Sequence, residues 1–125
     1  MDRLTYPWGD NIDETFANYG ENVGDTTPVD SYENGKSLYG VYNMAGNVWE
    51  WVADRYSETY YQNLPSSIFN PLGPDSGQER VLRGGSWYDA ADLIRTTVRL
   101  KEPPPVDNDN SFGNNFGFRC ARTFP

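Results

Sequence analysis

Short apolar segments alternate with long polar ones along the chain, and each apolar segment is about as long as one strand. Aromatic and β-branched residues recur there in runs too short for a buried helix. We predict strands at residues 47–56, 80–87, 96–100 and 116–122. No segment shows the three-to-four-residue spacing of a long amphipathic helix. The pattern therefore predicts a small sheet with little helix.

The first of these segments places an acid between apolar residues. If it is extended, Trp49 and Trp51 point to one face of the strand, and Val48, Glu50 and Val52 point to the other. A carboxylate flanked by valines is costly to bury unless an opposite charge or hydrogen-bond donors accompany it. We therefore expect Glu50 to have a defined partner.

Polar segments rich in glycine and proline connect the predicted strands. We expect loops at residues 11–37, 57–79 and 101–115, with a helical turn or two inside 57–64 and a short helix or turn at 88–95.

Two details near the later strands carry structural expectations. The pair Gly84 and Gly85 permits a bulge or a close backbone approach that other residues would block. At the end of the chain, Phe118 and Cys120 alternate with their neighbours, which predicts a terminal strand. In such a strand we expect the cysteine to be a small buried residue instead of a nucleophile.

Aromatic residues supply most of the apolar bulk of this 125-residue chain, with nine tyrosines, six phenylalanines and four tryptophans. Because these rings keep polar edges, we expect a core crossed by hydrogen bonds, with an aromatic turn in residues 1–10 closing its edge. The length suits one domain, residues 1–125. There is no apolar run of membrane-spanning length and no signal peptide at Met1.

Charge and residue usage argue against several classes of function. The net charge is −8, which disfavours nucleic acid or an anionic membrane surface as a partner. The chain has no histidine, which excludes Ser-His-Asp triads and histidine-held metals. Its single cysteine excludes a disulfide within the chain.

Two kinds of partner for Glu50 remain open. The Asn43 side chain, the Gly46 and Val48 carbonyls and the Glu50 carboxylate can converge into an all-oxygen cage of the kind that holds Ca²⁺. Alternatively, Asn43 only shapes a turn and Glu50 pairs with an arginine. Spacing by itself places the arginine alternative ahead.

Four motifs in order resemble one protein family. They are Tyr6-Pro-Trp-Gly9, Gly40-Val-Tyr-Asn-Met-Ala-Gly-Asn-Val-Trp-Glu-Trp51, Arg83-Gly-Gly-Ser-Trp87 and Gly117-Phe-Arg-Cys120. Together they resemble formylglycine-generating enzymes, also called sulfatase-modifying factors. The resemblance implies an α+β fold of the C-type-lectin-like kind, irregular and loop-rich, with a small antiparallel sheet. It also implies that the chain corresponds to the C-terminal portion of the family domain or to a minimal version of it.

The resemblance shifts the balance for Glu50 toward the cation. Family members hold a structural Ca²⁺ with the same four ligands that the spacing offers. A second family site maps loosely near Asn18, Tyr19 and Asp25, where this chain is several residues shorter. We therefore expect structural Ca²⁺ as the cofactor.

The catalytic groups of the family are not carried over. Its enzymes bind copper through two cysteines whose positions are taken here by Asp89 and Ile94, although Ser86 matches an active-site serine. Without thiolates a soft copper site cannot form, so we expect no copper and no catalytic residue. Cys120 matches a family cysteine that is structural.

We therefore expect a non-catalytic module that binds or displays a ligand, protein or small molecule, through the surface of residues 88–115. That segment resembles the variable region of retroelement-diversified proteins, and a soluble protein of prokaryotic or phage origin fits this. An ordinary solvated loop explains the segment equally well. The alternative functions are a formylglycine-generating type of enzyme and an accessory domain completed by a partner chain. The expected ligand contacts are Trp87, Tyr88, Asp89, Asp92, Leu93, Arg95, Arg99, Asn108, Asn110 and Phe112.

Overall fold

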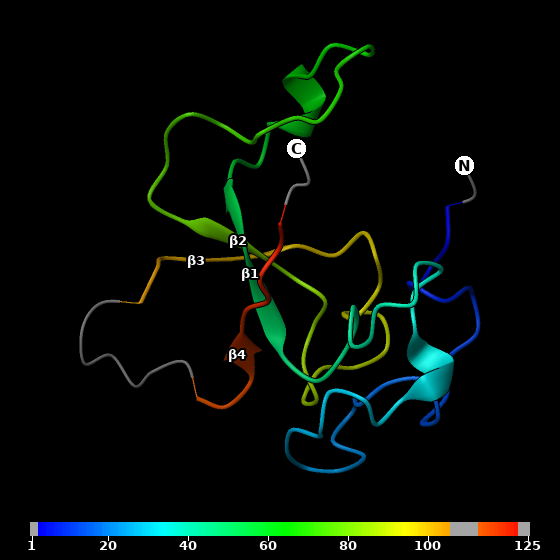
Figure 1. Ribbon diagram of the computed structural model, residues 1–125. Helices are drawn as coiled ribbons and strands as arrows, with labels where there is room; N and C mark the ends of the chain where they lie inside the picture. Colours follow the sequence, from blue (N-terminus) through cyan, green and yellow to red (C-terminus); the bar gives the residue numbers. More distant parts are fainter. Residues whose placement is uncertain (1–2, 106–112, 123–125) are drawn as a thin grey trace.

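The regular structure of the chain is one small sheet. The computed structural model describes residues 3–105 and 113–122, and Figure 1 shows the sheet beside a larger body of loops. The strands lie in the order β3-β2-β1-β4, and two short 3₁₀ helices, η1 and η2, lie outside the sheet. The elements are η1 (Glu33–Gly35), β1 (Trp49–Arg55), η2 (Tyr61–Asn63), β2 (Arg80–Arg83), β3 (Leu100–Glu102) and β4 (Phe116–Gly117).

Strand β1 is the centre of this sheet because it pairs on both sides. It runs antiparallel to β2, with Glu50 opposite Arg83, and parallel to β4, with Trp49 opposite Phe116. The antiparallel pairing of β2 with β3 completes the sheet. The prediction of a small sheet with little helix is confirmed, and the sheet is mixed instead of wholly antiparallel because β4 runs in the direction of β1.

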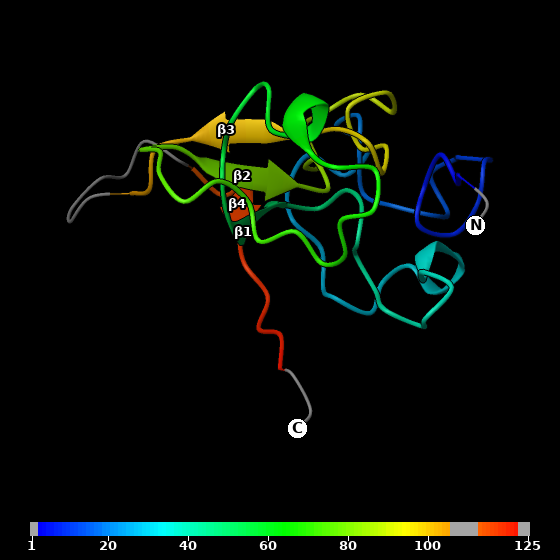
Figure 2. The ribbon, with the colours of Figure 1, turned by 90° about the horizontal axis from the view of Figure 1, so that it is seen from above.

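The loops gather at one end of the sheet and hold their own core. Segments 3–48 and 84–98 lie together on the right of Figure 1 and again on the right of Figure 2. Tyr6, Ala17, Ala45 and Ile94 form the buried cluster there. The four residues come from different stretches of the chain. Their packing therefore joins loops that strand pairing does not hold together.

An aromatic stack closes the edge of this core, as predicted for residues 1–10. The rings of Tyr6 and Trp8 lie 5.5 Å apart and nearly parallel, and Trp8 stacks in turn on Phe16 at 5.6 Å. The polar edges also find partners, since the Tyr6 hydroxyl donates to the Ala91 carbonyl at 3.2 Å. The expectation of an aromatic core is met only in part, because among the described residues Tyr6 is the one aromatic residue of the buried cluster, beside Ala17, Ala45 and Ile94.

The glycine pair after β2 allows the close approach that the sequence predicts. Gly84 and Gly85 have φ angles of +94° and +73°, in the left-handed region that side chains disfavour. A Cβ atom on Gly85 would lie 2.5 Å from the Cγ2 atom of Ile94. The pair therefore brings the backbone directly onto the loop core.

The third predicted strand begins later than expected. Residues 96–99 form turn and irregular structure, and β3 starts at Leu100. Thr96 is drawn toward the start of the chain, where its N–H donates to the Thr5 carbonyl at 2.9 Å and its hydroxyl to the Leu4 carbonyl at 2.7 Å. These bonds replace the strand pairing that its β-branched side chain predicts.

The terminal strand is shorter than predicted, and the expectation of a buried cysteine is wrong. Strand β4 ends at Gly117, after which the chain leaves the sheet (Figure 2). Phe118 is 76% exposed, and Cys120 is an exposed free thiol. The alternating pattern fails because Arg119 turns back toward the β1 segment, where its side chain is bound.

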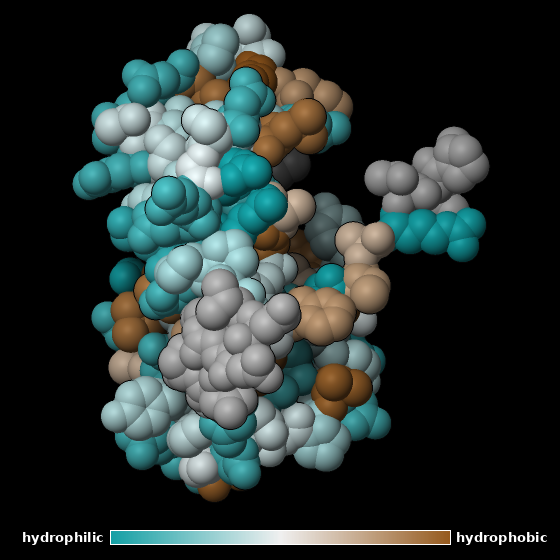
Figure 3. All heavy atoms as spheres, turned by 90° about the vertical axis from the view of Figure 1, so that its left-hand side faces the viewer, coloured by the Kyte–Doolittle hydropathy of each residue, from teal (hydrophilic) through white to brown (hydrophobic). Residues whose placement is uncertain are grey.

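The surface agrees with a chain without membrane-spanning helices. Within the described ranges no helix is long and apolar enough to cross a membrane. The face in Figure 3 is mostly hydrophilic, and its apolar side chains are scattered outside the grey atoms.

Replacing Ile94 with alanine tests the loop core. Ile94 is fully buried, so Ile94→Ala is expected to lower the free energy of unfolding by about 2–5 kcal/mol through lost contacts and a cavity. Its neighbour Leu93 is 42% exposed, and Leu93→Ala should change it by less than about 1 kcal/mol. Urea unfolding followed by tryptophan fluorescence measures both, and equal effects would contradict the assigned core.

Candidate functional site

The loop before β1 is shaped by residues that accept left-handed backbone angles. Asn43, Gly46 and Asn47 have φ angles of +51°, +78° and +68°, and glycine and asparagine tolerate this region best. The loop tightens further where the Val48 N–H donates to the Gly46 carbonyl at 3.0 Å. The turn predicted from these residue types is present.

Glu50 has a defined partner, and that partner is Arg119. The Arg119 Nε donates to one carboxylate oxygen at 2.5 Å, and its Nη2 donates to the other. The same guanidinium donates to the carbonyls of Tyr42 at 3.0 Å and Asn43 at 2.8 Å. The Glu50 side chain is only 17% exposed, and a fork of two charge-assisted bonds satisfies its charge. The arginine alternative of the sequence analysis is therefore observed.

Three of the four predicted Ca²⁺ ligands lie in this loop and the fourth, Glu50, lies in β1, and two of the four already accept hydrogen bonds. Arg119 takes both oxygens of Glu50, and the Gly46 carbonyl accepts the Val48 N–H. One atom is left over, because the buried Asn43 Nδ2 has no partner among the described residues. Since the two ends of an amide can be exchanged by a flip, that position fits a donor or an oxygen ligand. Calcium here stays a prediction.

The residues of the second predicted cation site do come together. Asn18 is 1% exposed, and its Nδ2 donates to the Asp25 carbonyl at 2.8 Å. Its side-chain oxygen, Oδ1, is buried and has no donor within the described residues. An acceptor in that position carries a desolvation cost that a hard cation would remove. This oxygen could serve as one ligand, and a cation beside Asn18 stays a prediction.

Asn47 joins the loops around that cluster. Its Oδ1 accepts hydrogen bonds from the Thr27 N–H at 2.9 Å and from Asn18 Nδ2 at 3.2 Å, and its Nδ2 donates to the Thr27 carbonyl. Its backbone N–H donates to the Asn18 carbonyl, and its carbonyl accepts the Trp87 N–H. Sequence reasoning treated Asn47 only as a turn residue and missed this role.

The positions that the resemblance gives to catalytic groups are structural here. Ser86 is fully buried, and its N–H donates to the Asp89 carboxylate at 2.9 Å, as its hydroxyl does at 2.5 Å. Ile94 belongs to the loop core. Asp89 thus closes a tight turn over Ser86, and neither position presents a reactive thiol.

Other predicted contact residues of this loop reach the solvent. Tyr88 is 60% exposed and Leu93 42% exposed. The Trp87 indole N–H is buried without an acceptor in the described residues, although its ring packs against Tyr88. Arg95 is exposed, and its Nε donates to the Asp92 carbonyl at 2.7 Å. The loop therefore displays aromatic, aliphatic and cationic groups together.

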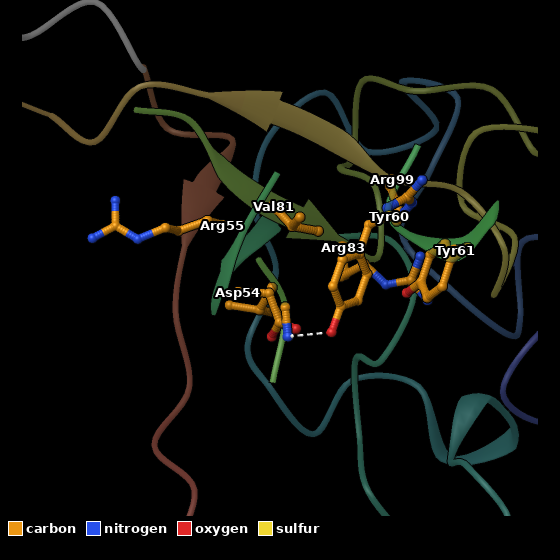
Figure 4. A pocket seen from close by; sticks show the side chains of 9 residues that line it. Asp54, Arg55, Tyr60, Tyr61, Val81, Arg83 and Arg99 are labelled. Atoms are coloured by element: carbon orange, nitrogen blue, oxygen red, sulfur yellow. Dashed lines mark hydrogen bonds between the residues drawn. The ribbon is translucent and has the colours of Figure 1, made fainter. Parts of the chain in front are cut away.

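Arg99 lies apart from them in a small pocket beside the sheet (Figure 4). The pocket measures about 150 Å³, and the Arg99 guanidinium lies 4.4 Å from the ring centre of Tyr61 and 5.3 Å from that of Tyr56. Arg83 and Arg55 line the same pocket, and the Arg55 side chain extends away from the other labelled side chains in Figure 4. Burial lowers the pKa of the Arg83 guanidinium, and the nearby charge of Arg99 lowers it further. This pocket is thus positively charged.

The predicted contact residues do not form one site. Arg99 lines the small pocket, while Arg95 lines a separate and larger cleft. Arg83 lines both, and its terminal nitrogens donate to the carbonyls of Val98 and Thr96. Sequence reasoning missed Arg83 and Arg119, whose motifs gave no signal of their contacts. Asn108, Asn110 and Phe112 lie outside the described residues.

Comparison with known proteins places these features in a wider group. A family model for the sulfatase-modifying factor enzyme 1-like domain matches residues 1–124. The chain is similar to serine/threonine-protein kinase Pkn1 of Chlamydia trachomatis serovar L2, at 43% identity over 119 residues, which is 95% of this chain and 18% of that protein. It is also similar to the formylglycine-generating enzyme of Streptomyces coelicolor, at 46% identity over 100 residues, which is 77% of this chain and 29% of that enzyme.

Two solved structures share the architecture. Treponema denticola variable protein 1 matches with a TM-score of 0.69 and 31% identity, covering 90% of this chain and 39% of that one. PvdO from Pseudomonas aeruginosa matches with a TM-score of 0.66 and 28% identity, covering 93% and 42%. The predicted C-type-lectin-like fold is confirmed by these matches. The chain spans less than half the length of each of these four proteins.

Replacing Asn47 tests whether its side chain joins the loops. Asn47→Ala is expected to lower the free energy of unfolding by about 2–4 kcal/mol, since buried donors and acceptors on Asn18 and Thr27 lose their partner. Asn70→Ala is the matched control, because Asn70 is exposed and also has a positive φ, +47°. The difference between the two variants in urea unfolding isolates the side-chain bonds, and a difference near zero would contradict the role of Asn47.

Proposed function

The chain belongs to the sulfatase-modifying factor enzyme 1-like domain family, and we propose that it serves there as a non-catalytic module that binds a ligand. The loop that carries Tyr88, Leu93 and Arg95 is its binding face. The ligand is a protein or a small molecule. The observation that carries this proposal is that Asp89 and Ile94 occupy the two positions where the family's catalytic cysteines would lie.

The side chains at those two positions make structural contacts. Ile94 is fully buried in the loop core, and the Asp89 carboxylate is bound to the N–H and hydroxyl of Ser86. A soft copper ion requires thiolates, and the one cysteine, Cys120, lies on the exposed chain after β4. These features support binding without oxidation chemistry.

The loop is fixed well enough to hold a binding surface in one shape. The Trp87 and Asp89 carbonyls each accept an N–H at 2.8 Å, from Glu21 and Gly20 respectively. Rigid display reduces the entropy that binding would otherwise cost. Exposed aromatic and arginine side chains on such a base are the groups that most often anchor a protein partner. The resemblance of the solved Treponema denticola variable protein 1 supports the same reading.

We further propose that Ca²⁺ stabilises the scaffold. The unpartnered Asn18 Oδ1 beside the Asp25 carbonyl is the strongest support, and the Asn43–Glu50 loop supplies the other predicted ligands. At the Asn43–Glu50 segment, a cation would have to share or displace the guanidinium of Arg119. The two loops are therefore distinguishable by mutation.

A display library tests the binding face. Peptides selected on the full chain from a random-sequence library should bind saturably, and Tyr88→Ala/Leu93→Ala should weaken binding by about tenfold, since both side chains are exposed anchors. Phe69→Ala/Leu72→Ala removes apolar groups that are 87% and 90% exposed elsewhere and should leave binding unchanged.

A cysteine-containing peptide incubated with the chain and copper should keep its thiol by mass spectrometry. Its conversion to an aldehyde would overturn the proposal.

Thermal melts with Ca²⁺ and with a chelator test the cation. At a hundredfold excess over its dissociation constant, a native-state ligand adds about 2.7 kcal/mol, or roughly 10 °C for a chain of this size. Glu50→Gln should abolish the Ca²⁺-dependent part of the shift if the ion binds that loop. It should lower both melts equally if Glu50 serves only Arg119.

Asn18→Asp distinguishes the second site in the same assay. The added carboxylate should strengthen Ca²⁺ binding and raise the melting temperature with Ca²⁺ present. In chelator, the same buried charge should destabilise the chain below the unmodified protein. A variant that is destabilised equally in both solutions would show that no cation binds beside Asn18.

A further inference from the structure

A large cleft opens between the start of the chain and the turn that precedes the Asn43 loop. It measures about 690 Å³ and is formed by residues from segments 3–7, 37–44, 83–84 and 95–97. Cavities of roughly 300–1,000 Å³ are the usual size for bound ligands and anchoring side chains. The cleft adjoins the proposed binding face at Arg95, which lines it, whereas Tyr88 and Leu93 do not.

The rim of the cleft exposes large apolar side chains. Leu38 is 75% exposed and Tyr39 is 91% exposed, and the neighbouring Val41 and Met44 are 38% and 42% exposed. All four belong to the lining. Apolar groups gathered beside a cavity, unlike single scattered ones, are typical of an interaction surface.

The turn that carries this rim is ordered by its own hydrogen bonds. The Ser37 N–H donates to the Val41 carbonyl at 2.9 Å, and the Gly40 N–H donates to the Ser37 carbonyl at 2.8 Å. The Ser37 hydroxyl oxygen accepts the N–H groups of Tyr39 and Val41. Leu38 and Tyr39 are thus held out at the tip of a fixed turn, which lowers the entropic cost of docking against them.

The charge of the cleft is opposite to that of the chain. Its lining contains Arg3, Arg83 and Arg95 and no acidic residue, whereas the whole chain has a net charge of −8. No described ion pair involves these arginines. Arg95 uses only its Nε, on the Asp92 carbonyl, and Arg3 has no hydrogen-bond partner among the described residues. Guanidinium groups with unused donors next to apolar walls favour carboxylates carried on an apolar body.

We propose that this cleft docks a polypeptide segment that combines large apolar side chains with Asp or Glu. A polypeptide is favoured because exposed apolar side chains, such as Leu38 and Tyr39, lie beside arginines outside the described ion pairs, and one segment can carry side chains that match both. The occupant is a segment of a separate partner polypeptide, whose carboxylates complement a lining that contains arginines and no acid. Apolar side chains fill the cavity, and carboxylates reach Arg3 and Arg95 at its edge.

The test uses a fluorescent apolar anion, 8-anilinonaphthalene-1-sulfonate, and three synthetic peptides. The dye should bind the full folded chain saturably and be displaced by a peptide that alternates leucine, phenylalanine and glutamate. Peptides with lysine in place of glutamate, or serine in place of the apolar residues, should not displace it. Raising the salt concentration should weaken the acidic peptide, because exposed charges are screened.

Variants locate the binding and separate this inference from the proposed function. Arg3→Glu and Leu38→Ser/Tyr39→Ser, all at exposed or edge positions, should each reduce the affinity of the acidic peptide by about tenfold. Tyr88→Ala/Leu93→Ala should leave it unchanged, whatever happens to ligands of the binding face. Circular dichroism melts confirm that each variant is folded.

Three results would overturn the inference. Dye binding that the acidic peptide does not displace would assign the cleft to a small molecule. Equal displacement by the lysine peptide would remove the role of the arginines. Sedimentation showing concentration-dependent self-association that Leu38→Ser/Tyr39→Ser abolishes would identify a second copy of the chain as the occupant.

Discussion

The loops of residues 3–48 and 84–98, called the loop body below, are held together by the hydrogen bonds of Asn47. The described part of the chain holds one small sheet and two 3₁₀ helices, and therefore few regular backbone ladders. Its loops need other partners for their N–H and carbonyl groups. Asn47 supplies them from one position, since it contacts Asn18, Thr27 and Trp87 through its side chain and backbone. Its left-handed φ angle makes this geometry reachable, and asparagine is among the few residues that accept such an angle readily.

The sheet and the loop body have different tasks in this arrangement. Pairing within the sheet sets the position of β1 and of Glu50 on it. Arg119, near the other end of the chain, binds the Glu50 carboxylate. Of the two positions where the family resemblance places thiols, the loops bury Ile94 and bond Asp89 to Ser86, and they leave Tyr88 and Leu93 exposed. The Trp87 and Asp89 carbonyls bond this loop to Glu21 and Gly20, and the Asp89 carboxylate bonds to Ser86, so these hydrogen bonds that hold the loop do not involve the side chains of Tyr88 and Leu93.

Features set by neighbouring residues could be predicted from the sequence. Strand β1, the glycine pair after β2 and the aromatic turn around Tyr6 follow from residue type and spacing, and the motifs indicate the family. Features set by distant contacts could not. The late start of β3 depends on Thr96 bonding to Leu4, and the short β4 depends on Arg119 turning to Glu50. No local pattern records which of several arginines meets an acid, so spacing left the partner of Glu50 open.

The contact between Arg119 and the β1 region has a consequence for how the protein is made. The bonds from Arg119 to Tyr42 and Glu50 span 77 and 69 residues, and Thr96 reaches Leu4 across 92. Contacts of such long separation form slowly, because the intervening chain must first be closed into a loop. On the ribosome, the N-terminal half emerges long before these partners are synthesised. Until those partners have been translated, it lacks these contacts and its aromatic side chains stay exposed to solvent.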